Sequence, residues 1–257
     1  MILESDYDEL IDDIHKCNNC CDGLIRPTSR ITGYHNNKLN PEPIVEDLWS
    51  IWQGSKEAKV MIVGQDWGDE KYLRLCLNDG RFISDIDANA TCTNLISLMN
   101  SIGIEILRPS KNESNPSCYF CNVVKCIRID KMTGKPIRGK VEDWARSCGP
   151  YTKRLIDIIS PSAVIALGRV PFESILHEFL DNESANYDKS KEFMRKVVGK
   201  ANDNYPYRLL VESTHPFLIK PGTRLFPVYH CGARVVNCTR SMDKQIDDWT
   251  KIKEHLN

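Results

Sequence analysis

The sequence has no apolar run close to the roughly 20 residues that a membrane-spanning helix needs, so we expect no membrane partner. Its first ten residues, MILESDYDEL, are acidic where a secretory signal would be basic. Internal repeats and low-complexity tracts are missing as well. These absences predict a cytoplasmic globular protein.

An excess of one charge is also missing, since 34 Lys and Arg stand against 35 Asp and Glu. The chain therefore has no overall basic field that would attract nucleic acid. Its positive residues are unevenly spread: six Lys or Arg stand with one Asp between 125 and 140, and three Arg stand without an acid between 222 and 240. The first stretch contains Gly134 and Pro136 and is predicted to be a loop. Such charge runs suit a solvated loop or a nucleic-acid surface.

Apolar periodicity predicts strands that alternate with helices. This order predicts an α/β protein with a mainly parallel sheet covered by helices on both faces. We expect one domain over 1–257, with an N-terminal helix and wrapping segment at 1–58 and a surface insertion at 181–206. The expected strands are 59–63, 118–124, 163–167, 207–212 and 224–229. The expected helices are 5–16, TNLISLMNSIG with its stop at Gly103, 141–159, 171–180 and 242–255.

The stretch KVMIVGQDWG at 59–68 joins a fully apolar strand to a polar end. The carboxyl ends of parallel strands are where open α/β sheets bind ligands. Gln65 and Asp66 are therefore candidate site residues, and the alternative is a turn that contains an Asp.

Cysteine is abundant, with eleven residues, although disulfides rarely persist in the cytosol. Cys17 and Cys20 have the two-residue gap that suits two thiolates on one metal centre. Three interpretations remain. Zinc would bind to Cys17, Cys20, Cys118 and Cys121; an iron–sulfur cluster would bind to Cys17, Cys20, Cys126 and Cys148; or all are free thiols.

The strand CYFCNVV argues against the zinc set. Side chains alternate along a strand, so Cys118 and Cys121 should point to opposite faces of the sheet. Cys126 lies past the strand end and Cys148 on the next helix, where both can approach the N-terminal pair.

With these elements in place, the chain resembles the uracil-DNA glycosylase superfamily, in particular its iron–sulfur branch. The resemblance rests on CNNC, VMIVGQDWG, GRF, CNVVKC, a later helical cysteine, SPSAVIALG and FPVYHCG, in this order. It implies a three-layer α/β/α fold around a four-stranded parallel sheet, with an N-terminal segment tethered by the metal. It also implies a 4Fe-4S cluster and a monomeric enzyme that flips a base out of DNA and hydrolyses its glycosidic bond.

The resemblance assigns roles to individual residues. Asp66 would handle the attacking water, with Asp69 as the second choice. Phe82 would stack on the flipped base, and Asn122 would read its edge, since an amide both donates and accepts. Gln65 would contact the base, although the iron–sulfur branch usually has Glu there.

A histidine must donate to the base as negative charge develops on it. His230 follows the strand RLFPVY and precedes the last helix, so we favour it over His215 in THPF. Cys231 and Gly232 depart from the Pro-Ser of the family, and this departure puts the phosphate contacts of the loop in doubt. The candidate DNA contacts are Gly232, Arg234, Thr239 and Arg240.

Gly68 occupies the position at which uracil-specific members carry a tyrosine beside C5 of the base. An open C5 side predicts a substrate bulkier than uracil, such as the hydroxymethylated or glucosylated cytosine of phage DNA, and hence a role in defence. The alternatives are uracil excision in base-excision repair and a module that binds DNA without cutting it.

Overall fold

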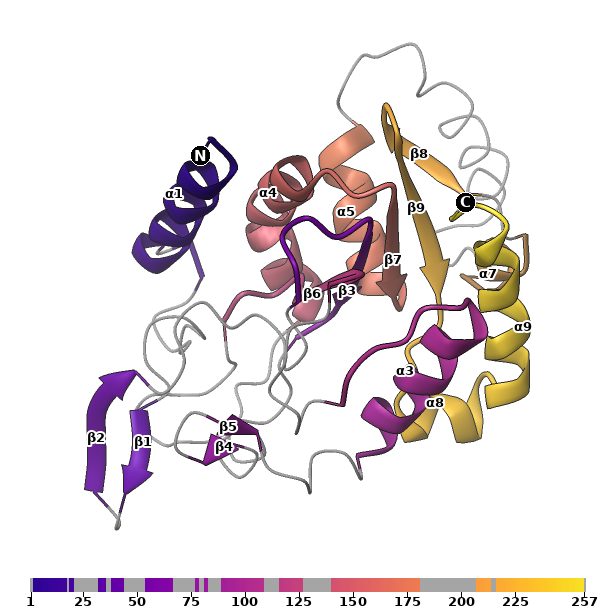
Figure 1. The fold of residues 1–257 in the computed structure, drawn as a ribbon, viewed down its shortest axis with the longest axis horizontal. Coiled ribbons are helices and arrows are strands. Elements are labelled where there is room, and N and C mark those ends of the chain that lie inside the picture. Colours follow the sequence, from indigo (N-terminus) through magenta and orange to yellow (C-terminus); the bar gives the residue numbers. More distant parts are fainter. Residues whose placement is uncertain are drawn as a thin grey trace.

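The computed structural model describes residues 2–17, 19–20, 32–35, 38–43, 54–66, 77–78, 81–82, 89–108, 116–126, 140–180, 207–213 and 216–256. Five strands form the central sheet, in the order β6-β3-β7-β9-β8 (Figure 1). Four of them are parallel, as predicted, and β8 adds an antiparallel edge strand beside β9. The strands are β3 (Val60–Gly64), β6 (Cys118–Asn122), β7 (Ala163–Leu167), β8 (Phe217–Lys220) and β9 (Thr223–Val228).

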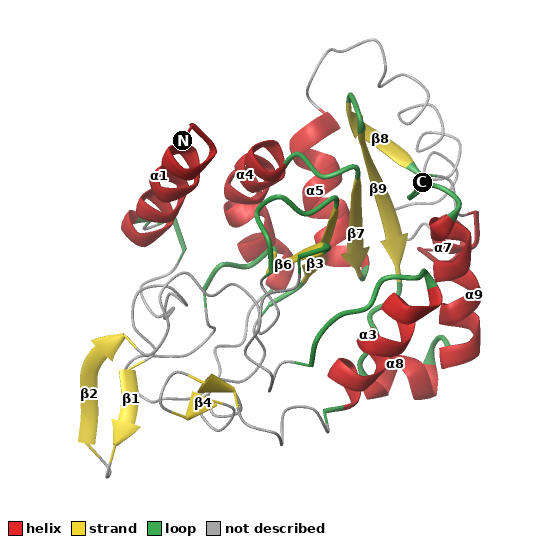
Figure 2. Cartoon of the chain, viewed as in Figure 1, coloured by secondary structure: helices red, strands yellow, loops and turns green. Residues whose placement is uncertain are grey.

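Helices cover both faces of this sheet, which confirms the α/β/α arrangement (Figure 2). Within the part of the chain that the structure describes, no helix is long and apolar enough to cross a membrane. The helices are α1 (Ile2–Lys16), α3 (Ala90–Ser101), α4 (Val141–Ile159), α5 (Arg169–Leu180), α7 (Tyr207–Ser213), α8 (Ala233–Cys238) and α9 (Met242–Lys253).

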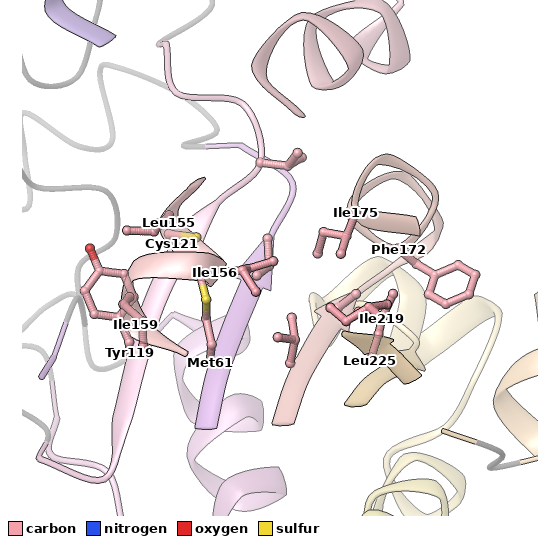
Figure 3. Packing of buried hydrophobic residues seen from close by; sticks show 14 of the residues in the cluster. Met61, Tyr119, Cys121, Leu155, Ile156, Ile159, Phe172, Ile175, Ile219 and Leu225 are labelled. Atoms are coloured by element: carbon pink, nitrogen blue, oxygen red, sulfur yellow. The ribbon is translucent and has the colours of Figure 1, made fainter. Parts of the chain in front are cut away.

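The alternation of side chains along the strands produces two separate cores. Met61 and Tyr119 face α1, α4 and α5, and Figure 3 shows this core with Ile156 and Phe172 packed above the sheet. Val60, Ile62 and Phe120 face α3 and α9. Each apolar side chain removed from water contributes about 1.5–3 kcal/mol, so these two cores dominate the stability.

Cys118 and Cys121 belong to opposite cores, as the strand pattern predicted. Cys118 packs with the α3 and α9 side, and Cys121 packs with the α1, α4 and α5 side. Two thiols separated by the sheet cannot bind the same metal ion, so the zinc set that contains both is wrong.

The first helix is held to the domain by packing and by polar contacts. Its apolar residues Leu10 and Ile14 are buried in the core with α4. The Tyr7 hydroxyl lies 3.0 Å from the Tyr119 hydroxyl of β6, and Arg154 of α4 forms an ion pair with Asp13.

The prediction of a strand at 207–212 is wrong, because these residues form α7. Three consecutive apolar residues, LLV, are compatible with either a buried strand or a helix, and periodicity cannot separate the two over so short a run. Arg208 and Glu212 form an i,i+4 ion pair that stabilises the helix. The edge strand is instead β8, whose residues alternate between buried and half-buried.

Two small antiparallel sheets lie outside the central one. The first joins β1 (Thr32–His35) to β2 (Lys38–Pro43), and the second joins β4 (Leu77–Asn78) to β5 (Arg81–Phe82). The predicted insertion at 181–206 lies outside the described residues.

Candidate active site at the carboxyl ends of the parallel strands

The parallel strands bring the candidate residues to one edge of the sheet. Gly64 at the end of β3 pairs with Asn122 at the end of β6, and Gln65 and Asp66 follow directly. On the other side of β3, the ends of β7 and β9 pair through Leu167 and Val228, and His230 comes two residues later. Three segments that are distant in the sequence therefore supply an amide, a carboxylate and an imidazole to the same edge.

The Asn122 side chain lies against Gly64. A Cβ atom at Gly64 would overlap Oδ1 of Asn122, so a larger residue would displace the amide from its present position. Beyond the strand end, the N–H groups of Val123 and Val124 donate to the carbonyls of Gly64 and Gln65, at 2.9 and 3.0 Å. The backbone of β3 thus fixes the position from which the Asn122 amide projects.

Asp66 and Gln65 are both half-buried at the end of β3. The Gln65 amide donates to Oδ2 of Asp66 at 3.3 Å. This contact restrains the orientation of the carboxylate. Gln65 therefore supports the Asp66 side chain by donating a hydrogen bond to it. An ionised glutamate at position 65 has no donor and would repel the Asp66 carboxylate.

His230 is held in one tautomer by its own turn. The Gly232 N–H donates to Nδ1 of His230 at 2.9 Å, so the neutral imidazole carries its proton on Nε2. A Cβ at Gly232 would lie 2.9 Å from Nδ1, so glycine is required for this close approach.

The electrostatics around His230 favour its neutral form. Burial lowers the pKa of His230 below its ordinary value, and the nearby Asp66 carboxylate opposes this shift. The second effect also shows that the Asp66 charge reaches the imidazole. A neutral imidazole with a proton on Nε2 can donate a hydrogen bond and does not itself carry a positive charge.

The candidate DNA contacts occupy two kinds of environment. Arg234 and Thr239 are exposed around α8. Arg240 is only 10% exposed, and it forms ion pairs with Asp248 of α9 at 2.6 Å and Glu212 of α7 at 2.7 Å. Its guanidinium therefore links α7 to α9. The contact of Arg240 with DNA stays a prediction.

Some candidates cannot be placed. Gly68, Asp69 and the rival His215 lie outside the described residues. Of Phe82 the structure describes the backbone, which pairs with Leu77 in β5.

Two of the predicted metal ligands, Cys20 and Cys126, lie near a third, Cys148 of α4, and the fourth, Cys17, lies near Tyr151 of the same helix. The Cys20 thiol hydrogen-bonds to Cys148 of α4, and Cys126 lies within electrostatic range of Cys148. Cys17, at the end of α1, hydrogen-bonds to the hydroxyl of Tyr151, one turn beyond Cys148. The hydrogen bond from Cys20 and the N–H of Lys125 lower the pKa of Cys148, although burial opposes them.

This donor set fits a metal centre that takes thiolates, because all four side chains are thiols on segments that meet at α4 and the surroundings lower the pKa of one of them. As the side chains stand, no three His, Cys, Asp or Glu residues within the described ranges form a closed metal-binding group. The chemistry of the residues therefore matches an iron–sulfur centre, whereas the closed coordination geometry is not formed.

Sequence reasoning missed the burial of Lys125, which it placed in a charge run that suits a solvated loop or a nucleic-acid surface. Lys125 is only 4% exposed, and its ammonium donates to the Asn122 carbonyl at 2.7 Å. Burial lowers the pKa of Lys125. The signal in the sequence was its position directly between a buried strand and Cys126.

Comparisons with known proteins identify the family of the chain. The family described as the uracil DNA glycosylase superfamily matches residues 51–251. The chain is 24% identical to a type-4 uracil-DNA glycosylase of Saccharolobus solfataricus, over 97% of this chain and 86% of the relative. It is 26% identical to a type-4 uracil-DNA glycosylase of Sulfurisphaera tokodaii, over 84% of this chain and 83% of the relative.

Proposed function

Because the chain belongs to the uracil DNA glycosylase superfamily and is a DNA glycosylase, we propose that it excises uracil from DNA. The base would be flipped out of the helix into the edge formed by Asn122, Asp66 and His230, and its N-glycosidic bond would be hydrolysed to leave an abasic site. The names of both relatives support uracil as the substrate. The same proposal has the enzyme acting as a monomer in the cytoplasm.

The observation that carries the proposal is the hydrogen bond from the Gly232 N–H to Nδ1 of His230, which leaves Nε2–H as the donor. When the glycosidic bond breaks, the bonding electrons move into the pyrimidine ring, and negative charge grows on its carbonyl oxygen. A neutral imidazole donor stabilises that charge in the transition state. Donors of this kind lower the activation free energy by about 2.7–4 kcal/mol.

Asp66 would act on the sugar side of the bond. Its carboxylate can orient a water toward C1′ and can stabilise the positive charge that develops on the sugar. The Gln65 amide at 3.3 Å supports the orientation of this carboxylate. Asn122 would hold the base edge through its amide, and the packing of this side chain against Gly64 supports that position.

We propose that Cys17, Cys20, Cys126 and Cys148 hold a 4Fe-4S cluster. Such a cluster would cross-link the end of α1, the end of β6 and α4. Glycosidic hydrolysis needs no electron transfer, so its role would be structural. The proximity of Cys20 and Cys126 to Cys148, and of Cys17 to Tyr151 on the same helix, supports this ligand set.

A bulkier modified pyrimidine remains a second candidate substrate only through Gly68, which lies outside the described residues. Matched oligonucleotides that carry uracil, thymine, 5-hydroxymethylcytosine or its glucosylated form decide between the two. We expect the release of uracil, detected as strand cleavage after alkali. Release of a modified cytosine in preference to uracil would refute the proposed substrate, and release of no base would refute the activity.

A further inference from the structure

The turn that carries His230 is fixed at its start by two hydrogen bonds. The carbonyl of Val228 accepts from the N–H of Gly168 at 2.8 Å and from the hydroxyl of Tyr207 at 2.9 Å. These contacts fix the end of β9. They leave the rest of the turn, from 229 to 232, to be oriented by other groups.

A side chain from a distant helix holds the middle of this turn. Nδ2 of Asn94, in the second turn of α3, donates to the carbonyl of Cys231 at 2.7 Å. The Cys231 thiol lies 3.6 Å from the carbonyl of Thr91, so the same residue contacts α3 through both its backbone and its side chain. The first two turns of α3 therefore form the wall behind the His230 turn.

The Cys231 carbonyl belongs to the peptide unit that leads directly to the Gly232 N–H. A peptide unit is rigid and planar, so a hydrogen bond that fixes its carbonyl also fixes the direction of its N–H. The N–H in question is the one that donates to Nδ1 of His230. Asn94 thus controls, through one peptide plane, the group that sets the tautomer of the imidazole.

The geometry points to Asn94 as a positioning residue for His230, which keeps the imidazole proton on Nε2 and aimed at the base. This inference rests on the proposed role of His230 in uracil excision. Asn94 itself does not contact the substrate in this scheme. Its loss should therefore change the rate of the chemical step more than the binding of DNA.

Two substitutions of nearly unchanged volume test this. Asn94→Asp replaces the donor with an acceptor that faces the Cys231 carbonyl, and Asn94→Leu removes the donor without adding charge. We expect either change to lower kcat for a uracil oligonucleotide by about 10-fold to 100-fold, since a small misplacement of a catalytic group can cost that much. KM should stay within about 3-fold of the wild type, because phosphate contacts dominate the binding of DNA. Asn100→Asp, at an exposed position of the same helix, is the matched control and should leave kcat unchanged.

A second measurement does not depend on activity. In protein labelled with ¹⁵N-histidine, the imidazole shifts of His230 should report the Nε2–H tautomer in the wild type and a mixture of tautomers in Asn94→Asp. A merely structural role of Asn94 would lower Tm and leave the tautomer unchanged. Wild-type kcat together with a wild-type imidazole spectrum in both variants overturns the inference, and if one variant does not fold, the other decides. Full activity of His230→Ala would instead refute the role of His230, while the imidazole spectrum would still decide whether Asn94 sets the tautomer.

Discussion

Cys148 and Cys231 are equally buried thiols, at 3% and 0% exposure, yet their surroundings shift them in opposite directions. Burial raises the pKa of Cys231 to about 12. The pKa of Cys148 is lowered instead, by the Cys20 thiol and the N–H of Lys125. Burial alone therefore does not decide the chemistry of a thiol. Cys148 has donors that stabilise a thiolate and is suited to bind a metal, whereas Cys231 packs as an apolar side chain within the turn that carries His230.

The largest effect should come from replacing the two thiols in turn. Cys148→Ser should abolish the iron content and the visible absorption of anaerobically prepared protein, because a ligand is lost. Cys231→Ser should retain both. Iron analysis of the two variants checks this, and iron retained in Cys148→Ser would contradict the ligand set. Loss of iron in Cys118→Ser would do so as well.

The next largest effect should come from removing the imidazole of His230, the residue that precedes Cys231. His230→Ala should lower kcat for uracil release about 100-fold or more, because a charge-stabilising donor is removed from the transition state. His215→Ala should have little effect. Single-turnover kinetics with a uracil oligonucleotide make the comparison. A larger loss of activity in His215→Ala than in His230→Ala would assign the catalytic role to His215.

The ion pairs of Arg240 join α7 to α9 through Glu212 and Asp248. Arg240→Met should reduce the free energy of unfolding by about 3 kcal/mol, because it leaves the buried Asp248 without its cation. Urea denaturation measures this. The slope of DNA affinity against salt should stay the same in this variant, whereas an Arg240 that contacts a phosphate would reduce the slope by about 0.9.

The smallest effect concerns the pKa of His230. Because the Asp66 charge raises this pKa, Asp66→Asn should lower it further, as an NMR titration of the imidazole would reveal. In the wild type the folded pKa already lies below the ordinary 6.5, so the unfolded chain binds the proton first. His230 therefore makes the free energy of unfolding fall as the pH decreases through 6.5. An unchanged or higher pKa in Asp66→Asn would contradict the contact between the two groups.

Local patterns were enough to predict much of this architecture. The alternation of side chains placed Cys118 and Cys121 on opposite faces, and the polar ends of buried strands located the candidate edge. The strand predicted at 207–212 was wrong, because an apolar run of three residues is too short to show whether its period is that of a strand or of a helix. The surroundings of Arg240 could not be predicted either, since its partner Glu212 lies 28 residues away. The same holds for Asn94, whose acceptor lies 137 residues further on.

The docking of α1 has a consequence for synthesis of the chain. Tyr7 meets Tyr119 across 112 residues, and Asp13 meets Arg154 across 141. At about 5–20 residues per second, roughly 7–30 seconds pass between the translation of α1 and that of its partner helix. During that time Leu10 and Ile14 are not covered by α4, so the nascent chain presents the apolar face of this helix to chaperones before the domain is complete.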